Sequence, residues 1–122
     1  MEERRESWYT YSVMLIIITN KVDRATREKA AEDLQGYIKF VVDIQREILT
    51  AGGLRHYEGE QQLLQNGSRQ ENLWGGGLDL TTNELDFDSM INIRPHQNNP
   101  SREILDPSTR ARVEQIVRRL LL

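Results

Sequence analysis

Residues 73–93 read LWGGGLDLTTNELDFDSMINI, and this stretch decides the class of fold. Two segments rich in apolar residues, 73–80 and 85–93, flank residues 81–84, a connection of a length typical of β-hairpins. A short connection of this kind joins antiparallel neighbours, because parallel strands need a much longer crossover. The stretch therefore predicts two paired strands in a sheet that is mainly antiparallel.

The rest of the chain adds strands and helices around this hairpin. The apolar runs 13–18 and 40–44 are rich in β-branched residues and predict two further strands, whereas residues 46–50 suit a strand or a helix equally well. Helices are predicted in three places: from Asp23 to about Ile38, from Glu58 to Asn66, and from Asp106 with its following proline onward. The sequence thus predicts an α+β fold, a mainly antiparallel sheet of about four strands with helices packed on one face.

Length and composition limit the classes of protein to consider. The 122 residues suit one domain, which we expect over residues 14–122 after a flexible N-terminal extension over residues 1–13. The absence of cysteine excludes disulfides, thiol catalysis and iron–sulfur clusters. A formal net charge of −3 argues against nucleic acid as a partner. The apolar run 13–18 is too short to span a bilayer, so we expect no membrane association and a cytoplasmic location.

The segment LDFDSMINIR, residues 85–94, carries the polar groups of greatest chemical interest. Alternation along a strand predicts one polar face made of Asp86, Asp88, Met90, Asn92 and Arg94. Carboxylates two residues apart on a strand are about 7 Å apart, so they could flank a cation through oxygen ligands. Arg94 could hold a phosphate or a carboxylate through two hydrogen bonds. The alternative is a solvated sheet face on which Arg94 pairs with a neighbouring aspartate.

Asp43 is a second candidate for a site. It lies in the apolar run FVVDI, residues 40–44, where a carboxylate must be paired, hydrogen-bonded or protonated. The residue is therefore either a structural hydrogen-bond acceptor or a third metal ligand beside Asp86 and Asp88.

The two histidines differ in their surroundings. His56 lies in LRHYEGE, close to Glu58 and Glu60, and could serve as a general base or a metal ligand. The alternative for His56 is a surface position or a structural hydrogen bond. His96 follows Pro95 in a predicted loop and is expected on the surface. No HExxH spacing occurs, so the sequence excludes the motif of a zinc hydrolase.

The glycine run 75–77 invites comparison with a phosphate-binding loop. No Lys-Ser or Lys-Thr pair follows, and no helix is predicted to begin there. Glycines inside a strand indicate a bulge or a close approach to the backbone instead. The neighbouring Trp74 is expected in the core or in a pocket wall.

Four segments taken together resemble a single protein family. They are VVDIQREILTAGG, QNGSRQENLWG, FDSMINIRP and NPSREILDP, at residues 41–53, 65–75, 87–95 and 99–107. In combination they resemble a bacterial family of proteins of unknown function, catalogued as domain of unknown function five-six-seven-four. The resemblance covers Met14 to the C-terminus, and members of that family begin at the equivalent of Met14. It implies no activity, because none is established for the family.

The resemblance also implies a set of site residues: Asp43, His56, Trp74, Asp88, Ser89, Asn92 and Arg94. Two departures from the family pattern weaken a site built on them. Tyr57 separates His56 from Glu58, where the family has an acidic residue close behind the histidine, and glycine stands at position 77, near which asparagine is usual.

These patterns lead to one preferred function. We expect a small binding or regulatory module for an anionic ligand or a protein partner, because no catalytic signature is complete. Asn92, Arg94 and Trp74 are the predicted ligand-binding residues. Self-association is also expected, since two-fold dimers are common among small proteins of this kind.

The alternative function is that of a metal-dependent hydrolase. Its divalent metal would be held by Asp43, Asp86 and Asp88, and His56 and Asp88 would be the catalytic residues, with His56 as the base. This alternative requires the named groups to converge on a common point.

Overall fold

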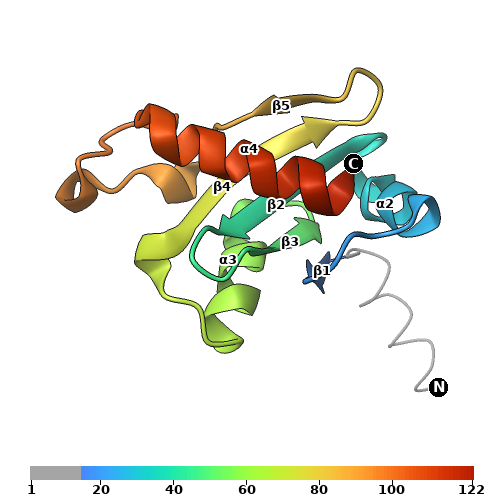
Figure 1. Cartoon of the computed structure of the whole chain (residues 1–122), viewed down its shortest axis with the longest axis horizontal. Helices are drawn as coiled ribbons and strands as arrows, with labels where there is room; N and C mark the ends of the chain where they lie inside the picture. Colours follow the sequence, from blue (N-terminus) through green and yellow to red (C-terminus); the bar gives the residue numbers. More distant parts are fainter. Residues whose placement is uncertain (1–14) are drawn as a thin grey trace.

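The computed structural model describes residues 15–122, which form one antiparallel sheet with helices on both of its faces (Figure 1). The strands are β1 (Leu15–Ile18), β2 (Tyr37–Asp43), β3 (Ile48–Gly52), β4 (Leu73–Asp79) and β5 (Glu84–Asp86). Their spatial order is β1-β3-β2-β4-β5, and all neighbours pair antiparallel. The predicted α+β class, the antiparallel sheet and the hairpin within residues 73–93 are confirmed.

The sheet has five strands instead of about four, because the ambiguous segment 46–50 turns back as a strand. The Asp43 carboxylate accepts hydrogen bonds from the backbone N–H groups of Gln45 and Arg46, at 2.9 and 3.0 Å. Glu47 then takes a positive φ of 60°, a conformation that reverses the chain. The result is a tight hairpin in which β3 pairs with β2.

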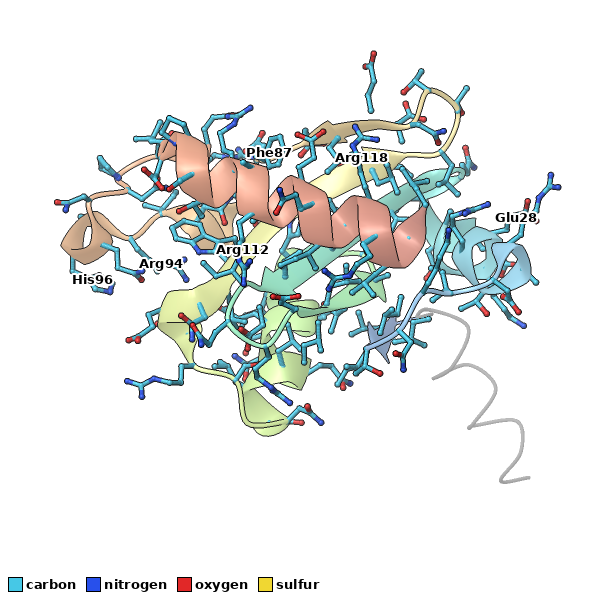
Figure 2. The ribbon with its side chains drawn as sticks, in the orientation of Figure 1. Glu28, Phe87, Arg94, His96, Arg112 and Arg118 are labelled. Carbon is cyan, nitrogen blue, oxygen red and sulfur yellow. The ribbon has the colours of Figure 1, made fainter. Side chains whose placement is uncertain are left out.

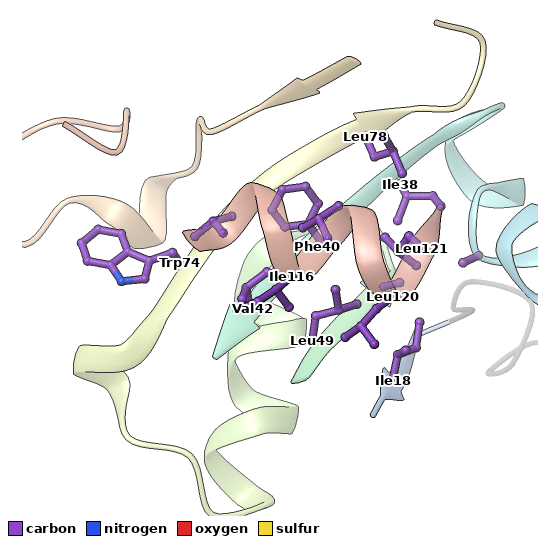
Figure 3. Packing of buried hydrophobic residues seen from close by; sticks show 14 of the residues in the cluster. Ile18, Ile38, Phe40, Val42, Leu49, Trp74, Leu78, Ile116, Leu120 and Leu121 are labelled. Carbon is purple, nitrogen blue, oxygen red and sulfur yellow. The ribbon is translucent and has the colours of Figure 1, made fainter. Parts of the chain in front are cut away.

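The first face of the sheet carries the larger part of the core. It is covered by α4 (Pro107–Leu121), while α2 (Arg24–Ala30) lies at the end of the sheet near the C-terminus (Figure 1). Asp106 caps α4 by accepting from the N–H of Thr109, as its sequence predicts. Figure 3 shows Ile116, Leu120 and Leu121 of this helix turned toward the side chains of the central strands. The core therefore depends on the apolar stripe of α4.

The second face is covered by α3 (His56–Gln65), so the expectation of helices on one face only is wrong. A separate buried cluster holds this helix: Val41, Ile48, Leu63 and Leu73. The helix approaches closely at Gly59, where a Cβ atom would lie 3.0 Å from Val41 Cγ2. Strands β2, β3 and β4 are thus buried on both faces, which explains why they are apolar rather than alternating.

Two predicted elements end earlier than their sequence patterns suggest. The helix from Asp23 stops at Ala30, because a short 3-10 turn, η1 (Glu32–Leu34), leads to residues 35 and 36, both with positive φ, and then into β2. The strand predicted over 85–93 stops at Asp86. Beyond it the chain forms 3-10 turns η3 (Met90–Asn92) and η4 (Pro95–Gln97), and a third such turn, η2 (Gln70–Asn72), precedes β4.

The predicted N-terminal extension, residues 1–13, lies outside the described residues. Within the described residues, no helix combines the length and the apolar character needed to cross a bilayer.

Candidate functional site

A pocket of about 380 Å³ opens on the α3 face of the sheet, beside the first turn of that helix. Four separate parts of the chain form it: β2, the start of α3, β5 with the segment that follows, and Arg102. The lining residues are Tyr37, Lys39, Arg55, His56, Tyr57, Asp86, Asp88, Ser89, Met90, Ile91 and Arg102. A volume of this size lies within the range of small-molecule sites.

The glycine run in β4 forms the base on which the pocket side chains lie. A Cβ atom on Gly75 would lie 2.8 Å from Ser89 Oγ and 3.1 Å from His56 Cδ2, and one on Gly77 would overlap the Tyr37 ring. Gly76 points to the other face, where its Cβ would lie 2.7 Å from the Phe40 ring. The glycines therefore allow close approach by side chains on both faces, in line with the sequence prediction of close approach rather than a phosphate loop.

His56 is held as a neutral ring with a fixed tautomer. Its Nε2 atom lies 2.7 Å from the carbonyl oxygen of Gly76, and since a carbonyl only accepts, Nε2 carries the proton. Burial lowers the pKa of His56, and the nearby Lys39 ammonium adds to this effect, against the opposing influence of the Gly76 carbonyl, Asp86 and Asp88. The Nδ1 atom is on the ring edge away from Gly75 and Gly76, and no group in the described part of the chain donates a hydrogen bond to it. His56 can therefore accept a hydrogen bond or a proton from a molecule in the pocket.

The two aspartates of the pocket are already engaged by protein groups. Asp86 accepts the Tyr37 hydroxyl at 2.5 Å and the backbone N–H of Asp88 at 3.2 Å. Burial, together with the hydrogen bond to Asp86, raises the pKa of Tyr37, so the hydroxyl stays protonated and donates to the carboxylate. Asp88 pairs with Arg102 at 2.8 Å. The two carboxylates thus form separate contacts instead of facing one shared cation.

Two cationic side chains in the pocket wall are not paired with a carboxylate of the described residues. Lys39 and Arg55 form no ion pair with any residue in the range 15–122. Lys39 is partly buried in the middle of β2, on the same face as Tyr37. Together with Arg102 they give the pocket three cations against two carboxylates, so its side chains leave an excess of positive charge.

Asp43 lies away from this pocket, in the turn between β2 and β3. It is fully buried, and one of its oxygens caps the turn. The structure therefore separates Asp43 from Asp86 and Asp88, in agreement with the alternative of a structural acceptor. Among the described residues, no group of three His, Cys, Asp or Glu side chains is placed to hold a metal ion.

Asn92 is buried beneath the pocket wall instead of on a solvated face. Its side chain accepts from the N–H of Gly75 at 2.8 Å and donates to the carbonyl oxygens of Gly75, Phe87 and Arg102 at 2.9–3.1 Å. The two bonds to Gly75 attach the segment after β5 to β4, and the bonds to Phe87 and Arg102 tie together two parts of that segment. Asn92 therefore shapes the pocket without lining it, and the predicted alternation over residues 86–94 is wrong because the strand ends at Asp86.

Arg94 and Trp74 form a buried pair at the far end of β4. The guanidinium is 4.1 Å from the centre of the Trp74 ring and donates to the carbonyl oxygen of Gln70 at 2.7 Å. Burial lowers the pKa of Arg94, and Glu60 opposes that change. Figure 2 shows Arg94 and His96 at the end of the molecule away from α2, and Figure 3 shows Trp74 at the corresponding end of the core. Neither Arg94 nor Trp74 lines the pocket, whereas His96 is exposed, as predicted.

The sequence prediction included His56, Asp86 and Asp88 but missed the cations and the aromatic groups around them. Lys39 had a usable signal, since it interrupts the apolar strand YIKFVVD two residues after Tyr37 and so lies on the same face. The sequence gives no such signal for Arg55, Tyr57 or Arg102, because only the tertiary fold brings these loop and helix residues to β2.

One comparison with known proteins bears on the whole chain: the family described as "Protein of unknown function (DUF5674)" matches residues 16–120. The chain belongs to the DUF5674 family. This membership confirms the resemblance inferred from the sequence and extends over the described strands and helices. The DUF5674 chain matches no curated protein and no solved structure, so the site must be interpreted from its own geometry.

Proposed function

We propose that this DUF5674 protein is a binding or regulatory module and that its pocket takes a small anion. The observation that carries the proposal is Lys39, a partly buried lysine in the pocket wall that pairs with no carboxylate among residues 15–122. A lysine ammonium beside a pocket is stabilised by an opposite charge placed close to it. An anionic ligand would supply that charge.

The distribution of charges around Lys39 supports the same conclusion. Arg102 compensates Asp88 at 2.8 Å, and the Tyr37 hydroxyl occupies one oxygen of Asp86. Arg55, at the start of α3, is a second cation that forms no ion pair within residues 15–122. A carboxylate or phosphate group could accept hydrogen bonds from both Lys39 and Arg55, and bonds of this charged kind are stronger than neutral ones.

The alternative of a metal-dependent hydrolase has less support. It required Asp43, Asp86 and Asp88 to converge, but Asp43 caps a hairpin turn elsewhere. Tyr37 and Arg102 already hold the other two carboxylates. The expected dimer and the cytoplasmic location stay predictions of the sequence.

The proposal is tested by titrating inorganic phosphate and acetate into the ¹⁵N-labelled protein and recording the amide resonances. We expect saturable shifts at Gly75–Gly77 and His56, and binding at least about fivefold weaker in Lys39→Gln and Arg55→Gln, a loss of roughly 1 kcal/mol. Lys29→Gln, which removes an exposed lysine of α2, is the matched control and should bind like the wild type. Absence of shifts, or equal affinity in all variants, would refute the proposal.

A further inference from the structure

The pocket has an apolar rim that a simple inorganic anion would leave uncovered. Tyr57 is 61% exposed and Met90 is 65% exposed, the highest values among the exposed large apolar side chains of the described chain. Both line the pocket, although Tyr57 belongs to α3 and Met90 to η3. Exposed apolar groups gathered at a polar pocket are typical of a binding surface.

The apolar surface continues inward from this rim. Ile91 also lines the pocket, and it packs against the buried cluster beneath α3. One part of the pocket is therefore apolar, while the cations Lys39 and Arg55 provide the charged part. Most small-molecule sites have this composition, in which apolar walls provide contact area and a few polar groups fix the orientation.

His56 places a third requirement on the chemistry of the ligand. His56 lines the pocket, and with its Nε2–H bonded to the Gly76 carbonyl oxygen the neutral ring has Nδ1 as its hydrogen-bond acceptor. A fully ionised carboxylate or phosphate has no proton to donate to it. A ligand that satisfies both Lys39 and His56 must therefore carry a separate donor, such as a hydroxyl group, close to its acid group.

We infer that the pocket binds an amphipathic organic acid, a 2-hydroxy acid or a close analogue with an aromatic or branched aliphatic body. The acid group contacts Lys39 and Arg55, the hydroxyl donates to His56 Nδ1, and the body covers Tyr57 and Met90. This inference rests on the proposed anion-binding function and adds the chemical class of the ligand.

Three probes that differ by one feature each separate these contributions. Phenyllactate has the acid, the hydroxyl and the apolar body, 3-phenylpropionate lacks the hydroxyl, and lactate lacks the phenyl group. We expect phenyllactate to bind about tenfold or more tighter than lactate, because burial of apolar surface adds to affinity. It should bind several-fold tighter than 3-phenylpropionate, because one hydrogen bond to a neutral group contributes a factor of roughly two to ten.

The rim is tested in the protein by Tyr57→Ser and Met90→Ser. Both side chains are exposed, so the fold should tolerate the changes, and circular dichroism with thermal melting checks this. Leu105→Ser is the matched control, since Leu105 is a 52% exposed apolar residue outside the pocket. The rim variants should weaken phenyllactate binding several-fold and leave lactate and phosphate binding unchanged, whereas the control should alter neither.

The outcomes separate the inference from the function on which it rests. If lactate and inorganic phosphate bind as tightly as phenyllactate, or if the rim variants behave like Leu105→Ser, anion binding stands and the amphipathic ligand class is overturned. Equal binding of phenyllactate and 3-phenylpropionate overturns the role of His56. If no probe, phosphate included, shifts any pocket resonance, the proposed function is overturned as well.

Discussion

At the scale of single residues, the shape of the pocket depends on glycines, which have no side chain to fill the space. Gly75 leaves room for His56 and Ser89, and Gly77 leaves room for the Tyr37 ring. The space at Gly75 lets the imidazole lie against β4 and reach the Gly76 carbonyl oxygen. Burial in that position costs the charged form of His56 more than the neutral form. The chemistry of the histidine therefore follows from the glycines opposite it.

The lowered pKa of His56 makes stability depend on pH. Below the ordinary histidine value of 6.5 the unfolded chain binds a proton more readily than the folded chain. The stabilisation is therefore complete above this value and is lost as the pH falls through the folded-state pKa. A tenfold difference in proton affinity corresponds to about 1.4 kcal/mol. Chemical denaturation across this pH range measures the loss.

His56→Gln should lack this component, because a glutamine amide can still donate to the Gly76 carbonyl oxygen but does not titrate. His96→Gln is the control, since His96 is exposed in a loop and should keep the wild-type profile. An unchanged pH profile in His56→Gln would show that the folded protein accepts a charged imidazole at this position.

At the scale of elements, an irregular segment stands where the sequence pattern predicted the continuation of a strand beyond Asp86. Residues 87–105 follow β5, and η3 within this segment contacts β4 beyond the point where β5 ends. Two buried asparagines hold the segment: Asn92 bonds to β4, while Asn99 donates to the carbonyl oxygens of Asn92, Ser101 and Glu103. Side-chain amides thus replace the missing ladder of backbone hydrogen bonds, as buried polar groups require.

This arrangement predicts a strong effect of Asn92→Asp. The carboxylate could still accept from Gly75 N–H, but it could no longer donate to the three carbonyl oxygens that the Asn92 amide now reaches. We expect a loss of about 3 kcal/mol or more in the free energy of unfolding, measured by urea denaturation. Asn98→Asp, at an exposed position of the same segment, should change stability by less than about 0.5 kcal/mol. Equal effects of the two would mean that Asn92 does not anchor the segment.

The sequence was sufficient for the elements whose signals are local. The cap at Asp106 and the hairpin within 73–93 both depend on neighbours along the chain, and each was predicted correctly. β3 was ambiguous because Ile48 and Leu49 suit a helix as well as a strand. It is a strand because Asp43 caps a turn that returns the chain to β2. The choice between helix and strand for this segment was therefore set by tertiary packing, because local propensity allowed both.

The candidate site was predictable only in part. His56, Asp86 and Asp88 were identified by residue type, and the pocket contains all three. Arg94 and Asn92 were assigned to a ligand because a strand was continued through them, although the chain leaves the sheet after Asp86 and buries both. Residues as far apart along the chain as Tyr37 and Arg102 form the pocket walls. No periodicity within a segment can show such contacts.

At the scale of the whole molecule, the sheet separates the larger hydrophobic cluster from the candidate pocket. The α4 face carries the large apolar cluster, and the α3 face carries the pocket with its charged residues. The overall formal charge of −3 contrasts with the excess of cations in the pocket. Under the proposed function, attraction of an anion would come from nearby groups such as Lys39 rather than from the total charge, which acts weakly beyond about 10 Å at moderate salt.

The positions of the three candidate metal ligands, Asp43, Asp86 and Asp88, predict how the protein responds to metal ions. Asp43 lies at a hairpin turn, while Asp86 and Asp88 are held by Tyr37 and Arg102. A cation at these carboxylates would compete with the contacts that they already make. Mg²⁺, Mn²⁺, Zn²⁺ or Ca²⁺, added singly to chelator-treated protein, should therefore leave the melting temperature unchanged. An ion at one hundred times its dissociation constant would otherwise stabilise the fold by about 2.7 kcal/mol, a shift of several degrees for a small protein. A saturable shift that disappears in the Asp86→Asn/Asp88→Asn double variant would reverse this interpretation and restore the metal-dependent hydrolase as the leading function.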